Sequence, residues 1–361
     1  MTTSMNDPRS RATEFCERFG LRLPILLAPM AGACPSSLSI AVMRAGGFGA
    51  CAALLMQPNE IEDWATEVRA NVNGPFQINL WIPDPPPVRD RSHEARVREF
   101  LSRWGPPVPE EAGDMSPPNF HEQCQALLRI APATVSSIMG LYAPGFVAEL
   151  KSRGISWFAT ATTGGEAKAA EAAGADVIIA QGMEAGGHRG AFDSAKAEQQ
   201  LVGLVALVPA IVDAVRIPVV AAGGIADGRG VAAALMLGAS ATVIGTGFLR
   251  CPEANVHSAW AEALAHTTPE RTILSRAFSG RPGRTIATDY VRAALEQDAP
   301  APAPYPVQRG LTTAMRLDAQ QSGDIQRMQA WAGQSAALGR AEPASLVTER
   351  IWSEAQTLLL R

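Results

Sequence analysis

Short apolar runs recur along this chain from residue 23 to residue 249, and segments with a helical pattern separate them. Runs of this kind are typical of strands that are buried on both faces of a parallel sheet. Repeated strand–helix units of this number predict an α/β fold, a closed (β/α)8 TIM barrel. The eight runs lie at 24–30, 47–53, 76–82, 134–139, 155–161, 176–182, 217–224 and 241–249.

The segments between the runs carry helix signals. The segment 58–70 is expected to be a helix with Asn59 in the N-cap position, because asparagine is a favoured cap residue. The segments 164–174 and 228–239 have glycine at or near their ends, where helices commonly stop. These segments predict short, tight strand–helix units.

Two regions are too long for ordinary connections in a barrel. The first, 83–131, contains two proline-rich stretches and is expected to pass over the barrel mouth. The second follows residue 250 and has a helical pattern that 298–306 interrupts with alternating prolines. We therefore predict three parts: a polar N-terminal segment (1–22), a barrel (23–250, with the insertion 83–131), and a helical extension that caps the substrate side and ends in C-terminal helices (251–361).

Composition narrows the class of partner. The 361 residues are 47% hydrophobic and 18% charged, with a net charge of −4, as expected of a compact enzyme-like globule. Without a lysine or arginine cluster, neither nucleic acid nor a membrane surface is expected as the main partner. Because no secretion signal or membrane span is evident, we expect a cytoplasmic protein that acts on small molecules. A homo-oligomer stays open.

The cysteines are widely spaced and show no metal-ligand pattern, so reduced thiols and no metal site are expected. Cys51 lies in an apolar run and is expected to be buried. Cys34 follows a strand end and could touch a ligand, although a packing role is favoured for it too. The full set is Cys16, Cys34, Cys51, Cys124 and Cys251.

The decapeptide QGMEAGGHRG, residues 181–190, is the most informative stretch of the chain. It follows the apolar run at 176–180 directly, so His188 lies just past a strand end. Gly186 and Gly187 carry no Cβ and let the backbone approach a flat ring or an anion closely. A glycine turn whose histidine merely satisfies a local hydrogen bond is the alternative. The strand-end position favours a ligand-facing loop.

Further candidates lie at other strand ends, where barrel enzymes hold their functional groups. Gly223 and Gly224 end the seventh run, and Gly245 and Thr246 end the eighth, so their backbone N–H groups and one hydroxyl could hold a phosphate. Asn79 and Gln181 offer amide groups to a ligand, or to nearby backbone if they are structural. Glu184 is expected to fix the loop or to pair with Arg189.

In the order of its motifs, the chain resembles the nitronate monooxygenases, formerly 2-nitropropane dioxygenases, from about Leu23 to its end. The resemblance implies noncovalently bound FMN, with its phosphate at the turns after the seventh and eighth strands and His188 in the catalytic position. The FMN positions that carry over are Met30, Asn79, Gln181, Gly186, Gly223, Gly245 and Thr246. The motifs are LAPMAG (27–32), QGMEAGGHRG, AAGGIADGRG (221–230), IGTGFL (244–249), FSGRPGR (278–284) and WAGQSAALGR (331–340).

Two departures from the family pattern bear on the site. Many members have Gln-Met-Gly-Thr where this chain has 243–246, so one side-chain contact to FMN is missing while the backbone turn is retained. After the fourth strand the chain reads SSIMGLY (136–142), where the family more often has a histidine or phenylalanine and a proline. We therefore expect the substrate pocket to differ.

The implied reaction converts a nitronate and O2 to a carbonyl compound and nitrite. His188 could act as a cation that stabilises the nitronate, which we favour, or as a neutral base that takes the α-proton of a nitroalkane. Arg281 and Arg284 could attract the anionic substrate, with surface solvation as the simpler interpretation. Tyr305 could line the pocket or anchor the extension.

Two other functions remain possible at this point. An FMN- and NAD(P)H-dependent quinone or enoyl-thioester reductase would share the glycine-histidine motif, although such enoyl reductases more often have glutamate at the position of Gln181. A flavin-binding barrel without catalysis, or an accessory protein that binds a partner through the long insertion and the extension, ranks last, because no motif position looks degenerate.

Overall fold

The structure contains the predicted barrel. A computed structural model of the chain describes residues 7–360. Its eight-stranded sheet has the order β1-β9-β8-β6-β5-β4-β3-β2, and a parallel bridge between Leu26 and Phe48 joins its two ends into a closed barrel. All eight predicted runs are strands: β1 Ile25–Leu27, β2 Gly49–Ala52, β3 Phe76–Trp81, β4 Thr134–Ile138, β5 Ser156–Ala161, β6 Val177–Gln181, β8 Val219–Ala222 and β9 Ala241–Ile244.

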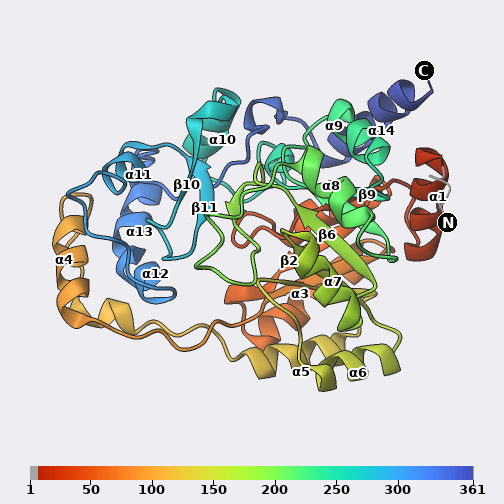
Figure 1. Cartoon of the computed structure of the whole chain (residues 1–361). Helices are drawn as coiled ribbons and strands as arrows, with labels where there is room; N and C mark the ends of the chain where they lie inside the picture. The colour runs from red at the N-terminus through yellow and green to blue at the C-terminus, as the bar shows by residue number, and fades with distance from the viewer. Residues whose placement is uncertain (1–6, 361) are drawn as a thin grey trace.

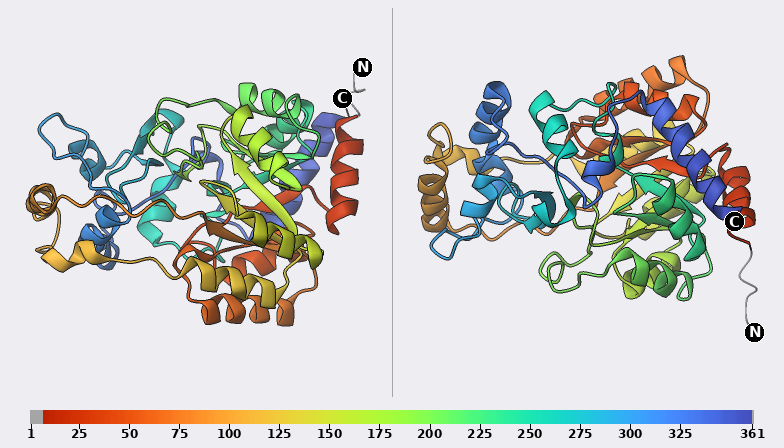
Figure 2. Two further views of the ribbon diagram at one scale, coloured as in Figure 1. Left: turned by 60° about the horizontal axis from the view of Figure 1, so that its bottom comes forward. Right: turned by 90° about the horizontal axis from the view of Figure 1, so that it is seen from above.

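Helices surround the sheet (Figures 1 and 2). Helix α3 begins at Pro58, with Gln57 as its N-cap, and the Gln57 N–H donates to Glu60 Oε2 over 2.6 Å. The predicted cap at Asn59 is therefore wrong, because proline suits the first helical position and moves the cap one residue upstream of it. The barrel helices are α2 Ser36–Arg44, α3 Pro58–Asn71, α5 Phe120–Ile130, α6 Pro144–Ser152, α7 Gly164–Ala172, α8 Leu204–Val212, α9 Gly228–Met236 and α14 Ala344–Leu359.

The last barrel helix comes from the end of the chain. Helix α14 packs against α9 and α2, in the place of the helix that would follow β9 (Figure 1). Its contact with α9 is close, because a Cβ on Gly228 would lie 2.6 Å from Ala355 N. The chain between β9 and α14 is thus a long detour that leaves the barrel and returns to complete it.

The barrel interior is filled from one end by an N-terminal helix. Helix α1, Pro8–Phe19, brings Phe15 and Phe19 against Phe158 of β5, with ring centroids 6.3 and 5.0 Å from it. The helix has a buried apolar face, which the polar composition of 1–22 did not predict, and residues 1–6 lie outside the described part. It lies at the end of the barrel far from α4 (Figures 1 and 2).

The 83–131 insertion and the extension pack together beside the barrel mouth. Helix α4, Arg91–Leu101, and the short helix η2, Glu110–Asp114, contact α12, Val307–Leu311. Their buried side chains form a second core with α11, Asp289–Ala293, and α13, Thr313–Ser322 (Figure 1). This packing gives a small lobe attached to the barrel, and α10, Ser258–Ala265, precedes the part of the lobe that comes from the extension.

The extension is not purely helical. Strands β10, Thr272–Ser275, and β11, Gly283–Ile286, form an antiparallel pair, and β11 also pairs with the two-residue strand β7, Gly187–His188. The register places His188 opposite Gly283. The extension therefore fixes the backbone of the histidine loop through sheet hydrogen bonds, a contact between segments that a local pattern does not reveal.

Candidate active site

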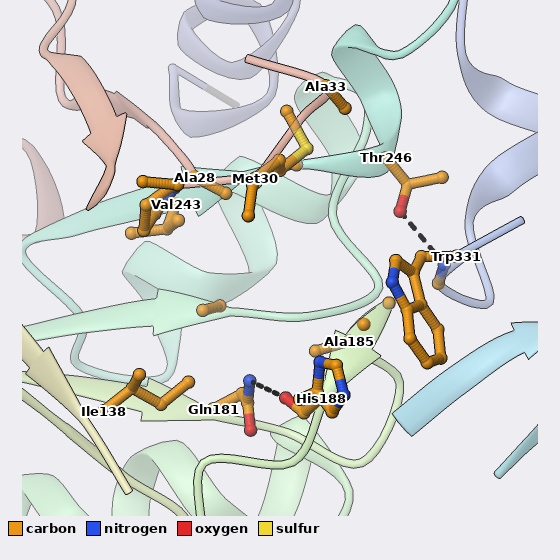
Figure 3. A pocket seen from close by; sticks show the side chains of 18 of the residues that line it. Ala28, Met30, Ala33, Ile138, Gln181, Ala185, His188, Val243, Thr246 and Trp331 are labelled. Carbon is orange, nitrogen blue, oxygen red and sulfur yellow. Dashed lines mark hydrogen bonds between the residues drawn. The ribbon is translucent and has the colours of Figure 1, made fainter. Parts of the chain in front are cut away.

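One cavity opens at the carboxyl ends of the barrel strands. Its volume is about 230 Å³, and we call it the strand-end cavity. In Figure 3, Ala28, Met30 and Val243 lie on one side of it and Gln181 and His188 on the other. The structure brings together ten of the predicted site residues on its walls: Met30, Asn79, Gln181, Gly186, Gly187, His188, Gly223, Gly224, Gly245 and Thr246.

Gln181 holds the histidine loop to its own strand. Its Nε2 donates to His188 O over 3.1 Å (Figure 3), and its Oε1 accepts from Gly190 N over 2.7 Å. Buried Arg189 supports the same loop, since its Nη1 donates to Gly182 O over 2.6 Å. The amide of Gln181 is thus engaged with nearby backbone, the structural alternative considered for it, although the residue also lines the cavity.

His188 stands between two indoles. Its ring centroid lies 4.7 Å from that of Trp81 and 4.7 Å from that of Trp331, and its Nε2 is 2.7 Å from Ser279 Oγ. Burial in this aromatic setting, helped by the charges of Arg281 and Arg309, lowers the pKa of His188 to about 3. The imidazole is therefore neutral near pH 7. This lowered pKa runs against the expectation of a cationic His188 and favours the neutral imidazole.

Backbone glycines form the opposite part of the wall. Gly223 and Gly224 have φ values of +118° and +67°, which side chains rarely adopt. A Cβ on Gly186 would lie 2.5 Å from Gly333 N and 2.8 Å from Thr246 Oγ1. Gly333 N in turn donates to Thr246 Oγ1 over 3.0 Å (Figure 3). Three segments of the chain meet here at backbone distance, and glycine turns of this kind are typical of anion-binding walls.

Asn79 anchors the β3 side of the cavity. Its Nδ2 donates to Ser136 Oγ of β4 over 3.0 Å, and its Oδ1 has no hydrogen-bond donor within residues 7–360. Asn79 is 5% exposed, so its carbonyl is a nearly buried acceptor at the cavity wall. It could accept a hydrogen bond from a ligand without giving up a protein contact.

Arg281 and Tyr305 line a neighbouring cavity and do not line the strand-end cavity. This second cavity, of about 510 Å³, shares Leu54 and Trp81 with the first. Arg281 is 2% exposed and its Nη1 is 3.1 Å from Asp84 Oδ2, so the surface interpretation is wrong. We call it the proline-lined cavity after Pro83, Pro85, Pro86, Pro87, Pro117 and Pro118.

Three other candidate residues contact protein groups, and the structure gives them a structural role. Arg284 is buried and its Nε donates to Met183 O over 2.8 Å. Glu184 fixes the loop, as expected, but through Leu204 N, which donates to its Oε1 over 2.8 Å, and no ion pair with Arg189 forms among the described residues. Cys34 does not line the cavity, and burial raises the pKa of its thiol to about 12.

The sequence reasoning missed several cavity residues. Trp81 ends the predicted third strand, so its position was a usable signal. Trp331 begins the WAGQSAALGR motif, which was recognised but given no role. Arg309 follows the proline-rich break and had no local signal. Trp260 Nε1 and Gln329 Nε2 are buried cavity donors without a partner in the described chain.

All five cysteines are free and buried, as expected of reduced thiols. Within residues 7–360, no group of three histidine, cysteine, aspartate or glutamate side chains is arranged to hold a metal ion. No helix in the described part of the chain is long and apolar enough to cross a membrane.

Comparison with known proteins places the chain in one family and also shows similarity to FabK. The family model described as nitronate monooxygenase matches residues 14–352. The nitronate monooxygenase of Paraburkholderia phytofirmans is 36% identical over 345 residues, which are 93% of this chain and 93% of that protein. Among solved structures, nitroalkane oxidase from Streptomyces ansochromogenes has a TM-score of 0.85 at 34% identity, covering 94% of this chain and 98% of that one. FabK from Thermotoga maritima has a TM-score of 0.75 at 27% identity, covering 96% and 97%.

Proposed function

Because this chain belongs to the nitronate monooxygenase family, we propose that it binds FMN and oxidises alkyl nitronates, such as propionate 3-nitronate, with O2 to a carbonyl compound and nitrite. Family membership makes it an oxidoreductase, and the cofactor and the substrate are what we propose. One observation carries the proposal: His188 and the glycine turns after β8 and β9 line the same cavity.

The cavity residues fit FMN. Gly223, Gly224 and Gly245, with the Thr246 hydroxyl, would hold the phosphate, because their backbone lies open where a Cβ would intrude or strain the chain. A Cβ on Gly245, for example, would lie 3.1 Å from Ala28 Cβ. Ala28 and Met30 offer a small, apolar edge to a flat ring.

Amide and indole groups around the ring site would supply its polar contacts. Asn79 Oδ1 is a nearly buried acceptor with no donor among residues 7–360, and Gln329 Nε2 and Trp260 Nε1 are buried donors without partners there. Unpaired buried polar atoms are rare in native proteins, so their grouping around one cavity supports a polar ligand. When bound, FMN would accept an electron from the nitronate.

We propose that Arg309 binds the negative charge of the substrate and that His188 accepts the proton. Arg309 lines the cavity, and no side-chain hydrogen bond to its guanidinium forms within the described residues. A guanidinium keeps its charge at neutral pH even though burial lowers the pKa of Arg309. Neutral His188 can take the α-proton of a nitroalkane, so that a neutral nitroalkane can also enter the reaction.

The test is spectroscopic and kinetic. The purified protein is expected to carry FMN, and anaerobic mixing with propionate 3-nitronate is expected to change the flavin spectrum. In air, oxygen uptake and nitrite release should follow. A protein with bound FMN that shows neither a spectral change nor oxygen uptake would overturn the proposal.

A reductase is the second candidate, favoured by the similarity to FabK. The same FMN site would then be reduced by NADH or NADPH and would pass hydride to a quinone or an enoyl thioester. Stopped-flow mixing with NADH separates the two functions. Flavin reduction by NADH that is faster than the reaction with any nitronate would support the reductase.

A further inference from the structure

The proline-lined cavity has an unused set of hydrogen-bond donors. Arg281 is 2% exposed, and its Nε and Nη2 have no partner within residues 7–360. The hydroxyl of Tyr305, on the wall of the same cavity, is also buried without a partner in that range. A buried donor without an acceptor is costly, so three of them beside one cavity indicate a ligand that supplies oxygen acceptors.

The geometry of the Arg281 donors selects a carboxylate. Nε and Nη2 form one edge of the planar guanidinium and match the two oxygens of a carboxylate, while the remaining nitrogen, Nη1, is held by Asp84 Oδ2 at 3.1 Å. Arg89, on the same wall, offers no such edge, because its Nε and Nη2 already donate to Glu94 over 2.5 and 2.6 Å. Arg281 is therefore the arginine of this wall that keeps one unpaired guanidinium edge, while Asp84 occupies its other nitrogen.

The Trp81 indole lies between His188 and the unpaired donors of the proline-lined cavity. Its indole lies 4.7 Å from the imidazole of His188 on one side and 5.8 Å from the ring of Tyr305 on the other, between centroids. Ser279 links the backbone of Arg281 to His188. Its Oγ accepts a hydrogen bond from Arg281 N over 3.3 Å and also contacts His188 Nε2. The Arg281 side chain reaches Asp84, and its charge is near enough to His188 to lower the pKa of the imidazole.

We propose that the proline-lined cavity binds the distal carboxylate of an extended substrate, whose nitronate end reacts in the strand-end cavity. The two cavities share Trp81 and Leu54 and are therefore adjacent, and an extended substrate would have to pass these two side chains to occupy both. The prolines and Phe120 supply an apolar lining for its methylene chain. This inference rests on the proposed function for the reacting end only.

Selectivity between length-matched nitronates tests the proposal. The nitronate of 6-nitrohexanoate should have a kcat/KM at least tenfold higher than that of 1-nitrohexane in the wild type. The preference should be smaller for the three-carbon pair, propionate 3-nitronate and 1-nitropropane nitronate, because Trp81 separates His188 from Tyr305. Equal kcat/KM values for the six-carbon pair would overturn the proposal.

Tyr305→Phe is the sharpest variant, with Tyr290→Phe as its control. Loss of a hydrogen bond to a charged group should lower kcat/KM for the six-carbon acid about tenfold or more and leave 1-nitrohexane nitronate within about twofold. Tyr305 loses no protein hydrogen bond among the described residues, so Tm should not fall. Tyr290 donates to Ala277 O over 2.9 Å, so its variant should lose Tm but keep the selectivity. An equal loss for both substrates in Tyr305→Phe would overturn the proposal.

Hexanoate binding gives a readout that is independent of turnover. Calorimetry on the FMN-loaded protein should show hexanoate binding that weakens about tenfold in Tyr305→Phe. Hexanoate binding without selectivity for the six-carbon acid would mean a free-acid site and would contradict the proposed substrate tail. If no nitronate is turned over at all, the proposed function fails, while Tyr305-dependent hexanoate binding still supports the carboxylate site and its absence overturns it.

Discussion

The two cavities meet at Trp81 but are built in different ways. The strand-end cavity takes much of its wall from the ends of the barrel strands and from glycine turns, with side chains of the extension such as Arg309 and Trp331 completing it. The proline-lined cavity takes its walls largely from the 83–131 insertion and from the extension, and buried side chains supply its polar groups. The difference suggests a division of roles: the barrel would hold the cofactor and the reacting atoms, and the two long segments would choose the substrate. Changes in the first cavity should therefore affect every nitronate alike.

His188→Asn should have the largest effect. Loss of the imidazole removes the proton acceptor, so kcat/KM for nitroalkanes should fall about a hundredfold or more, with FMN retained. Steady-state oxygen uptake measures kcat/KM, and the flavin absorbance of the purified variant measures the bound FMN. Ser279→Ala, which removes only the hydroxyl 2.7 Å from Nε2, should cost less. Unchanged turnover in His188→Asn would show that the histidine is structural.

Gly186→Ala should separate steric crowding from backbone strain. The new Cβ would lie 2.5 Å from Gly333 N, so the three segments must move apart, at a cost of about 2–3 kcal/mol of unfolding free energy and with loss of FMN. Gly187→Ala is the matched control, because its Cβ meets nothing within 4 Å although φ is +74°. That variant should lose about 1 kcal/mol to strain and keep FMN. FMN retention measured after gel filtration decides between them.

The titration of His188 should make stability depend on pH. Its pKa falls from 6.5 to about 3 on folding, so between these values the unfolded chain binds one more proton than the folded protein. Stability therefore rises with pH in this window and is lost as pH falls below about 6.5. From pH 6.5 to 5 the wild type should lose about 1.6 kcal/mol more than His188→Asn, because the slope rises toward about 1.4 kcal/mol per pH unit only below pH 6.5. Urea unfolding at several pH values measures the difference, and parallel curves would contradict it.

Thr246→Val should give the smallest effect in the strand-end cavity. The variant removes the acceptor of the Gly333 N–H, so the unfolding free energy should fall by about 1 kcal/mol. Thr242→Val is its control, because the buried Thr242 Oγ1 has no partner in the part of the chain that the structure describes. The control should be neutral or slightly stabilising in thermal unfolding. Equal losses would mean that the hydrogen bond to Gly333 contributes nothing.

The barrel and much of its site were predictable, because their signals are local. Each buried strand shows as an apolar run, and functional groups at the strand ends follow from the topology, as His188 and Gly223 illustrate. The charge of His188 was not predictable. Its pKa depends on Trp81, Trp331 and Arg281, which are distant in sequence and reach it only through the fold.

The lobe beside the barrel was not predictable from the sequence, because its contacts join segments that are far apart in the chain. Arg281 looked like a surface residue, since nothing near it in sequence reveals its burial or its contact with Asp84 of the insertion. The pairing of β7 with β11 is likewise a contact between segments far apart in the chain. Proline-rich stretches indicated irregular backbone, but not that two of them would enclose one cavity.

Helix α14 has a consequence for how this chain can fold and be redesigned. Val347, Ile351 and Ala355 are buried, and α14 packs against α9 and α2; each of the two larger side chains contributes about 1.5–3 kcal/mol. During synthesis the helical layer around the barrel therefore remains incomplete until α14 has left the ribosome. Deletion that starts at residue 361 and proceeds inward would remove α14, a helix that covers the barrel, before it shortened the lobe. To shorten the part of the lobe that comes from the extension, residues must therefore be deleted between β9 and α14, and α14 must be kept.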